Sequence, residues 1–208
     1  MDKIKNIVFD LGGVILTIDR DEAVRRFKLV GLEQAEELLD PYHQKGDFLA
    51  WEEGRLTTEE FYDAIRRLAG KYISNEDIAY GIHGFIADMP AYKLEMLEEL
   101  RKSYNLYLLS NTNPIVMAWA SSPLFSDTGK TLEQYFDKMY LSYQLGVTKP
   151  HPQIFHHLIK DSGIIPSETL FVDDGPANVE AGKALGMRVF QPENGEDFRH
   201  IFSEKGHF

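Results

Sequence analysis

The stretch from Ile4 to Leu16, with the sequence IKNIVFDLGGVIL, decides the fold. Its apolar run at residues 7–9 is typical of a middle strand in a parallel sheet that is covered on both faces. Ligands of such sheets bind beyond the carboxyl ends of the strands, which is where Asp10 would lie. Gly12 and Gly13 allow the backbone to turn tightly around whatever Asp10 contacts. From this stretch alone, an ordinary turn begun by Asp10 is as good an interpretation as a ligand site.

Three later stretches favour the ligand site. A second apolar run, residues 106–109, is followed by Ser110 and Asn111, and a third, residues 170–172, is followed by Asp173 and Asp174. Between them, Lys149 precedes a helical pattern. Strands that alternate with helices predict right-handed crossovers and a parallel, doubly wound α/β sheet. The polar residues that follow these strands would therefore gather at one edge of that sheet.

This order of motifs resembles the haloacid dehalogenase-like (HAD) hydrolase superfamily over nearly the whole chain. The stretches FDLGGVI, LSNTN, YLSYQLGVTKP and FVDDGPANVEAG are most similar to the branch that contains bacterial α-D-glucose-1-phosphate phosphatase. The resemblance implies a Rossmann-like HAD core with an inserted, all-helical cap of the C1 four-helix type. It also implies a small phosphorylated sugar or metabolite as the substrate.

Composition excludes several other classes of protein. The chain has 208 residues and no cysteine, so disulfides, thiolate metal sites and cysteine nucleophiles are absent. Its net charge of −11 argues against non-specific binding to nucleic acid or to an anionic membrane. No apolar run approaches the roughly 20 residues of a membrane span, and the N-terminal run is broken by Asp10. We expect a cytoplasmic protein, as a monomer or homodimer, whose partner is a small molecule.

The periodicity predicts two domains. Residues 1–16 and 86–208 would form the core domain, and residues 17–85 a helical cap with no strand in it. Within the cap, Asp19 begins one helical pattern and Thr57 with Glu60 reads as a capping box. In the core we predict further strands at residues 139–141 and 188–190, a helix begun by Pro150, a helix at 176–185 and a helical tail from residue 196.

The candidate site has the groups that phosphoryl transfer needs. The Asp10 carboxylate can attack phosphorus and form an aspartyl-phosphate. Mg²⁺ would offset the repulsion between two anions, held by Asp10, Asp174 and the carbonyl of Gly12, with Asp173 as a direct ligand or as a partner of the bound waters.

Other residues would bind the phosphate itself. Lys149 would supply a positive charge beside the transferring phosphoryl group. Phosphate would also be bound by the backbone at Leu11 and Gly12 and by Ser110 and Asn111.

One position departs from the resembled family, in which most phosphatases carry a second Asp two residues after the nucleophile. Here that position is Gly12, and general acid–base help is worth about 10²–10⁴-fold in rate. Three explanations are open. The protein has lost catalysis and kept binding, or another group, from the cap or a metal-bound water, acts as the acid and base. Alternatively, the leaving group needs little protonation, as with a sugar 1-phosphate.

The cap segment 51–55, Trp-Glu-Glu-Gly-Arg, could contact a sugar, but we favour a solvated helix end. The leading hypothesis is a Mg²⁺-dependent phosphatase that acts on a small phosphorylated metabolite through Asp10. A 2-haloacid dehalogenase, a sugar phosphomutase and a catalytically impaired phosphoryl-binding protein remain alternatives.

Overall fold

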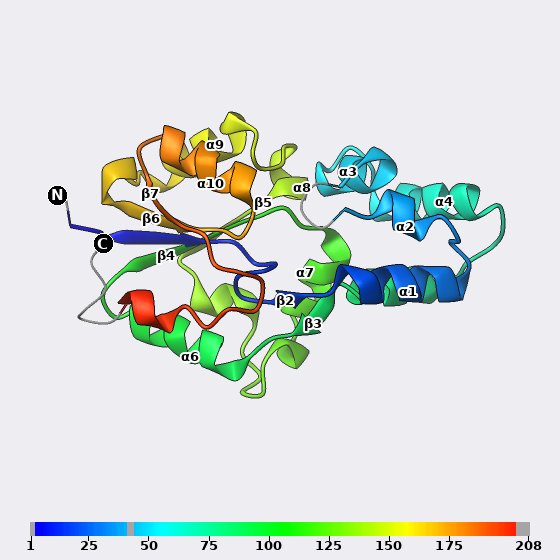
Figure 1. Cartoon of the computed structure of the whole chain (residues 1–208), viewed down its shortest axis with the longest axis horizontal. Coiled ribbons are helices and arrows are strands. Elements are labelled where there is room, and N and C mark those ends of the chain that lie inside the picture. Colours follow the sequence, from blue (N-terminus) through cyan, green and yellow to red (C-terminus); the bar gives the residue numbers. More distant parts are fainter. Residues whose placement is uncertain (1–2, 41–43, 203–208) are drawn as a thin grey trace.

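Strand β1 (Asn6–Phe9) is the middle strand of a five-stranded parallel sheet, and all four of its residues are buried. In this computed structural model, which describes residues 3–40 and 44–202, the strand order is β5-β4-β1-β6-β7 (Figure 1). The other strands are β4 (Asn105–Ser110), β5 (Lys138–Leu141), β6 (Thr169–Val172) and β7 (Arg188–Phe190). The predicted doubly wound α/β fold is confirmed. Since all the strands are parallel, β1, β4 and β6 deliver their C-terminal residues to one edge.

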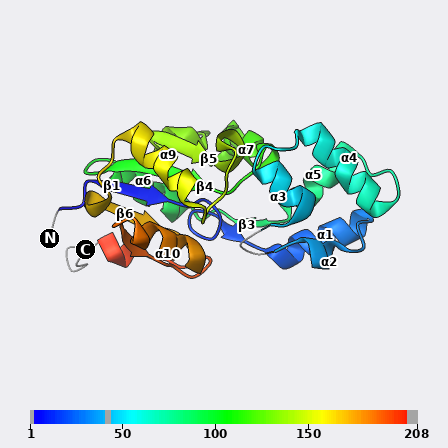
Figure 2. The same cartoon turned by 90° about the horizontal axis from the view of Figure 1, so that it is seen from above.

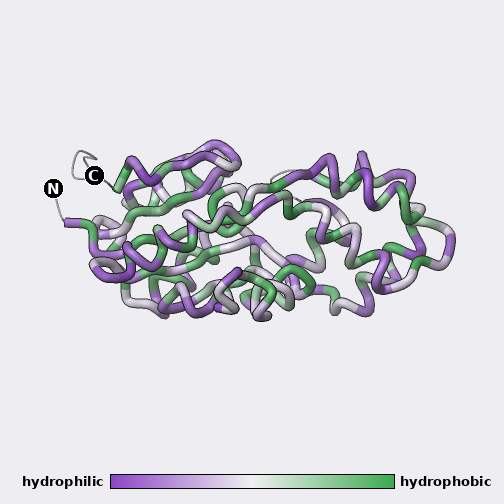
Figure 3. The backbone as a smooth tube through the Cα atoms, turned by 90° about the horizontal axis from the view of Figure 1, so that it is seen from below, coloured by the Kyte–Doolittle hydropathy of each residue, from purple (hydrophilic) through white to green (hydrophobic). Residues whose placement is uncertain are grey.

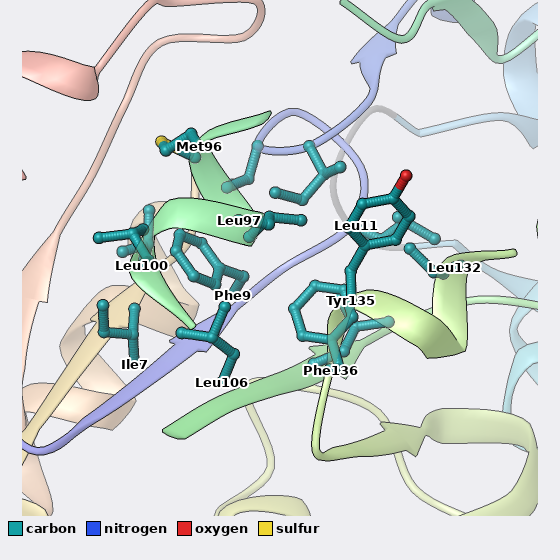
Figure 4. Close-up of a cluster of buried hydrophobic side chains, with 14 of the residues drawn as sticks. Ile7, Phe9, Leu11, Met96, Leu97, Leu100, Leu106, Leu132, Tyr135 and Phe136 are labelled. Carbon is teal, nitrogen blue, oxygen red and sulfur yellow. The ribbon is translucent and has the colours of Figure 1, made fainter. Parts of the chain in front are cut away.

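Helices cover both faces of the sheet, as the uninterrupted apolar run of β1 requires. On one face, Ile7 and Phe9 pack with residues of α6 (Ala91–Leu100) and of the 3-10 helix η2 (Leu132–Tyr135) (Figure 4). Residues of α7 (Pro114–Ala120) and of the 3-10 helix η4 (Arg199–Phe202) belong to the same cluster. On the other face, Val8 packs in a cluster with α9 (Pro152–Ser162), while α10 (Pro176–Ala184) contributes Ala181. The short helices are α8 (Ser142–Leu145), η1 (Pro123–Phe125) and η3 (Pro166–Glu168).

A helical lobe extends from the edge of the sheet, at the end of the molecule opposite the chain termini (Figures 1 and 2). Its helices are α1 (Arg20–Val30), α2 (Ala35–Leu38), α3 (Gly46–Glu52), α4 (Thr58–Ala69) and α5 (Asn75–His83). Apolar and polar segments alternate along the lobe (Figure 3), and its apolar side chains form a hydrophobic cluster of their own. Within that cluster the Trp51 ring stacks on the Phe61 ring at 4.0 Å between centroids.

Side-chain caps fix where these helices begin. Asp19 accepts a hydrogen bond from the backbone of Glu22 at the start of α1. Thr57 and Glu60 form the predicted capping box at the start of α4, and Ser74 caps α5. Each such cap is worth about 1 kcal/mol.

The prediction of helix from residue 17 onward is wrong at its first two residues. Thr17–Ile18 form strand β2, which pairs antiparallel with β3 (Ile86–Asp88) where the chain leaves the sheet and returns to it. Strands of two and three residues are too short to leave a period in the sequence, and their pairing is non-local.

Two predicted helix boundaries in the core are also wrong. Helix α9 begins at Pro152 instead of Pro150, because a ring nitrogen of His151 caps it by accepting a hydrogen bond from the backbone N–H of Gln153. The predicted helical tail is reduced to η4 within the described residues, and residues 203–208 lie outside them.

Candidate active site

Asp10 lies at the C-terminal end of β1, where its buried carboxylate is held by two donors. Oδ1 accepts hydrogen bonds from the backbone N–H of Leu11 at 2.7 Å and pairs with Nζ of Lys149 at 2.9 Å. The following loop is closed by Ile15 and Leu16, whose backbone N–H groups both donate to the Leu11 carbonyl. The Asp10 side chain is therefore fixed at the edge of the sheet, with Oδ2 outside these bonds.

Lys149 is buried between two carboxylates. Its Nζ lies 2.6 Å from Oδ2 of Asp173 as well as 2.9 Å from Asp10. Burial by itself lowers the pKa of Lys149, but the charges and hydrogen bonds of the two aspartates outweigh it and raise the pKa above its ordinary value. The side chain is thus a permanent cation beside Asp10.

Asp173 is fully engaged by protein groups. Besides Lys149, it accepts hydrogen bonds on Oδ1 from the backbone N–H of Gly175 and from Nδ2 of Asn178, both at 2.9 Å. These contacts hold both of its oxygens, so Asp173 orients Lys149 and leaves little capacity for a further ligand.

Asn111 clamps the backbone of Lys149. Its Oδ1 accepts from the backbone N–H of Lys149 at 2.7 Å, and its Nδ2 donates to the carbonyl of the same residue at 2.9 Å. Ser110, at the end of β4, is buried and makes one long hydrogen bond of 3.4 Å to the Asn111 carbonyl. Both residues line the cavity described below, together with Asn113, which caps α7 as its place before a proline suggests.

Asp174 lies directly against the loop that follows β1. A Cβ on Gly13, whose φ is +73°, would be 2.0 Å from Oδ2 of Asp174, so only glycine fits there. Carboxylate oxygens of Asp10, Asp173 and Asp174 lie within 4.8 Å of one another.

The charge balance of this cluster fits a bound cation. Burial, opposed by Lys149 and reinforced by the neighbouring aspartates, raises the pKa of Asp10 to about 7. Burial and Asp173 raise the pKa of Asp174 to about 6. One lysine thus leaves negative charge uncompensated, and the oxygen donors of Asp10 and Asp174 are those that Mg²⁺ prefers.

A cavity of about 260 Å³ opens above Asp10 between the sheet edge and the helical lobe. The sheet contributes Asp10, Gly12, Ser110, Asn111, Thr112 and Asp174, and the lobe contributes Arg20, Gln44, Phe48, Trp51, Glu52 and Ile82. Asn194 also lines it and binds both the N–H and the carbonyl of Ile18, which ties the β2 strand to the C-terminal part of the chain.

The interpretation of residues 51–55 as a solvated helix end is wrong for the first three. Trp51 is 1% exposed and belongs to the core of the lobe, and Glu52 is half-buried in the cavity wall. Glu53 is half-buried as well, and it pairs with the exposed Arg55 at 2.7 Å. An acid beside an aromatic residue is a weak signal in the sequence for Glu52, and no signal in the sequence points to Arg20 or Asn194.

The fold agrees with what comparison with known proteins shows. Residues 4–186 match the family model described as haloacid dehalogenase-like hydrolase, and the chain belongs to this family. It is therefore a hydrolase by family. No helix in the described ranges is long and apolar enough to cross a membrane.

Three relatives are similar over almost their whole length. The chain is 56% identical to D-ribitol-5-phosphate phosphatase of Bacteroides thetaiotaomicron, over 94% of this chain and 95% of that one. A predicted HAD-like family hydrolase from Porphyromonas gingivalis has 46% identity and a TM-score of 0.93, with 97% of each chain covered. The HAD family enzyme BT-2542 of B. thetaiotaomicron, solved as a mutant with magnesium and inorganic phosphate, has 40% identity and a TM-score of 0.93, covering 97% of this chain and all of the other.

Proposed function

We propose that this protein is a Mg²⁺-dependent phosphatase that hydrolyses a small phosphorylated polyol or sugar through an aspartyl-phosphate on Asp10. One observation carries the proposal: Asp10 lies on the cavity floor with one carboxylate oxygen held by Lys149 and Leu11, and with a second acid, Asp174, beside it. A nucleophilic carboxylate that is fixed and flanked by a cation is suited to attack phosphorus.

Each residue of the site has a task in this reaction. Asp10 forms the bond to phosphorus, and Lys149 offsets negative charge on the phosphoryl oxygens. Asp173 and Asn111 keep Lys149 in place, and Ser110 offers a hydroxyl to the phosphate. When bound by Asp10 and Asp174, Mg²⁺ supplies positive charge that brings the anionic phosphate to an anionic nucleophile.

The cavity and the relatives support a small substrate. A volume of about 260 Å³ falls below the roughly 300–1,000 Å³ that is usual for drug-sized ligands, so a five- or six-carbon phosphate suits it. The amides of Gln44, Asn113 and Asn194 in its wall can hydrogen-bond hydroxyl groups. Because the phosphatase that shares 56% identity acts on D-ribitol 5-phosphate, we place this substrate ahead of the sugar 1-phosphates that the sequence suggested.

The test is phosphate release from D-ribitol 5-phosphate, from a set of sugar 1-phosphates and from an aryl phosphate, each with Mg²⁺ and with chelator. We expect metal-dependent turnover, highest for the polyol phosphate, and at least a 10³-fold loss in Asp10→Asn. Turnover that persists in Asp10→Asn would contradict an aspartyl-phosphate. A wild-type protein that releases no phosphate from any substrate would favour a phosphoryl-binding role.

A further inference from the structure

Cleavage of an alkyl phosphate leaves a proton to be supplied. The departing alkoxide is a strong base, and a positioned acid that protonates it contributes about 10²–10⁴-fold in rate. Asp10 is committed to phosphorus in the proposed reaction. Gly12, two residues after Asp10, has no side chain that could donate a proton.

The titratable side chains that line the cavity are few. Within the described residues they are Asp10, Arg20, Glu52 and Asp174. Asp174 faces Asp10 as the second acid of the metal cluster. Arg20 is hydrogen-bonded to Glu36, which raises its pKa further, so it does not release a proton near neutral pH. Glu52 is the only one of the four that is free to act as an acid.

Glu52 is poised for that task by its surroundings. It is the last residue of α3, half-buried in the wall that the lobe contributes, and none of the described residues forms a hydrogen bond or ion pair with it. By contrast, the neighbouring Glu53 pairs with Arg55 and accepts a hydrogen bond from Oγ1 of Thr148. A carboxyl group without a protein partner in a cavity wall is available to a substrate.

The end of α3 is docked on the sheet side of the cavity. Gly54, with φ of +64°, approaches the carbonyl of Tyr143 so closely that a Cβ would lie 2.2 Å from the oxygen. Thr148, which binds Glu53 at 3.4 Å, is the residue before Lys149. These two contacts hold the residues that directly follow Glu52 against the sheet side of the cavity that Glu52 lines.

The charges around Glu52 keep it protonated in the free protein. Burial, followed by the negative charges of Asp10 and Glu53, raises its pKa to about 8. Arg55 is paired with Glu53, and Arg20 in the same cavity lining is paired with Glu36. Helix α8, which packs against α3, carries no charged side chain, and α4, which also packs against it, has the acids Glu59 and Glu60 in its first turn. At neutral pH the group can therefore donate a proton.

We propose that Glu52 is the catalytic acid and base of this active site, an inference that rests on the proposed phosphatase function. In the first step an oxygen of Asp10 forms a bond to phosphorus while the bond from phosphorus to the leaving oxygen breaks. The Glu52 carboxyl proton passes to that oxygen. In the second step the Glu52 carboxylate takes a proton from water, the water oxygen binds phosphorus, and the bond to Asp10 breaks. This releases inorganic phosphate and restores both side chains.

The experiment compares Glu52→Gln with the wild-type enzyme on two substrates in single-turnover conditions with Mg²⁺. D-ribitol 5-phosphate has a leaving group that needs a proton, whereas 4-nitrophenyl phosphate has one that departs as an anion. We expect the first turnover to slow by about 10²–10⁴-fold for the polyol phosphate and by less than tenfold for the aryl phosphate. A second measurement uses excess aryl phosphate. Because water activation is also lost, the variant should then release a burst of about one nitrophenol per enzyme and accumulate phosphorylated Asp10, detectable by mass.

Glu59→Gln, an exposed acid on α4, is the matched control and should behave as wild type. If Glu52 only binds substrate hydroxyls, Glu52→Gln will raise KM for the polyol phosphate without a burst on the aryl phosphate, and the inference is overturned. An equal loss on both substrates in the first turnover overturns it as well. If the wild type turns over and Asp10→Asn does not, but Glu52→Gln is fully active, the inference alone falls. If the wild type is inactive on every phosphate, the proposed function falls with it.

Discussion

Replacing Lys149 by Met removes the one cation between two buried carboxylates. Nζ of Lys149 lies 2.9 Å from Asp10 and 2.6 Å from Asp173, and its side chain is fully buried. Methionine has a similar length and keeps the apolar contacts of the lysine stem, but it offers no donor. The substitution therefore tests the charge of Lys149 more than its volume.

The expected loss of stability follows from what remains unpaired. Two charge-assisted hydrogen bonds disappear, each worth about 1.5–3 kcal/mol. Removing one partner of a buried ion pair costs about 3–5 kcal/mol, because the other charge stays in a poorly solvated place. We expect the free energy of unfolding to fall by about 3–5 kcal/mol near pH 7.5 without Mg²⁺, and phosphatase activity to be lost.

The loss of stability in Lys149→Met should depend on pH. Without Lys149, the pKa of Asp10, already raised to about 7 by burial, rises further, so the folded variant takes up protons that its unfolded chain does not. Stability then increases as pH falls, and the difference between variant and wild type narrows toward about pH 5. Urea unfolding at both pH values measures it, with Lys160→Met, an exposed site on α9, as the control. A loss below about 1 kcal/mol near pH 7.5, or one that widens at low pH, would refute the argument.

Two further predictions concern the carboxylates and the loop beside them. Without Mg²⁺, the wild type should lose stability as the pH rises from about 5 to about 8. The reason is that the pKa values of Asp10 and Asp174 are about 7 and about 6 in the folded protein but near 3.8 in the unfolded chain. Mg²⁺ should therefore raise the melting temperature more at about pH 8 than at about pH 5. A melting temperature that is flat with pH would contradict this. Gly13→Ala should cost about 1–2 kcal/mol from its positive φ and should also weaken Mg²⁺ binding in calorimetry, since the Cβ displaces Asp174. Gly129→Ala has the same φ and open space around it, so it should show the strain without the metal effect.

The sheet and its motif residues could be predicted because each depends on a local pattern. A continuous apolar run identifies β1, and parallel pairing then brings the residues that follow β4 and β6 beside Asp10. The pattern could not predict which contacts each of these site residues makes. The sequence predicts phosphate binding at Asn111, and the structure adds that its side chain holds the backbone of Lys149, while Asp173 accepts from three donors. Such roles depend on distances between residues far apart in the chain.

The wall of the cavity was the least predictable part for the same reason. Helix α3 has seven residues, too few for a clear period, and it lies between non-local neighbours, with Trp51 in the core of the lobe and Gly54 against Tyr143. Strand β2 likewise forms only because β3 returns beside it.

The same strand bears on the missing acid at position 12. A Cβ on Gly12 would lie 3.3 Å from two side-chain atoms of Ile18, which belongs to β2, so a larger residue requires Ile18 to move. Ile18 also lines the cavity and is held by both groups of the Asn194 amide. An acid at position 12 would therefore need the Ile18 side chain to shift by a few tenths of an ångström. Since Gly12 has no side chain, a proton donor has to come from elsewhere in the cavity lining, which among the described residues includes Glu52. Glu52 in the lobe would thus supply the proton that Gly12 cannot.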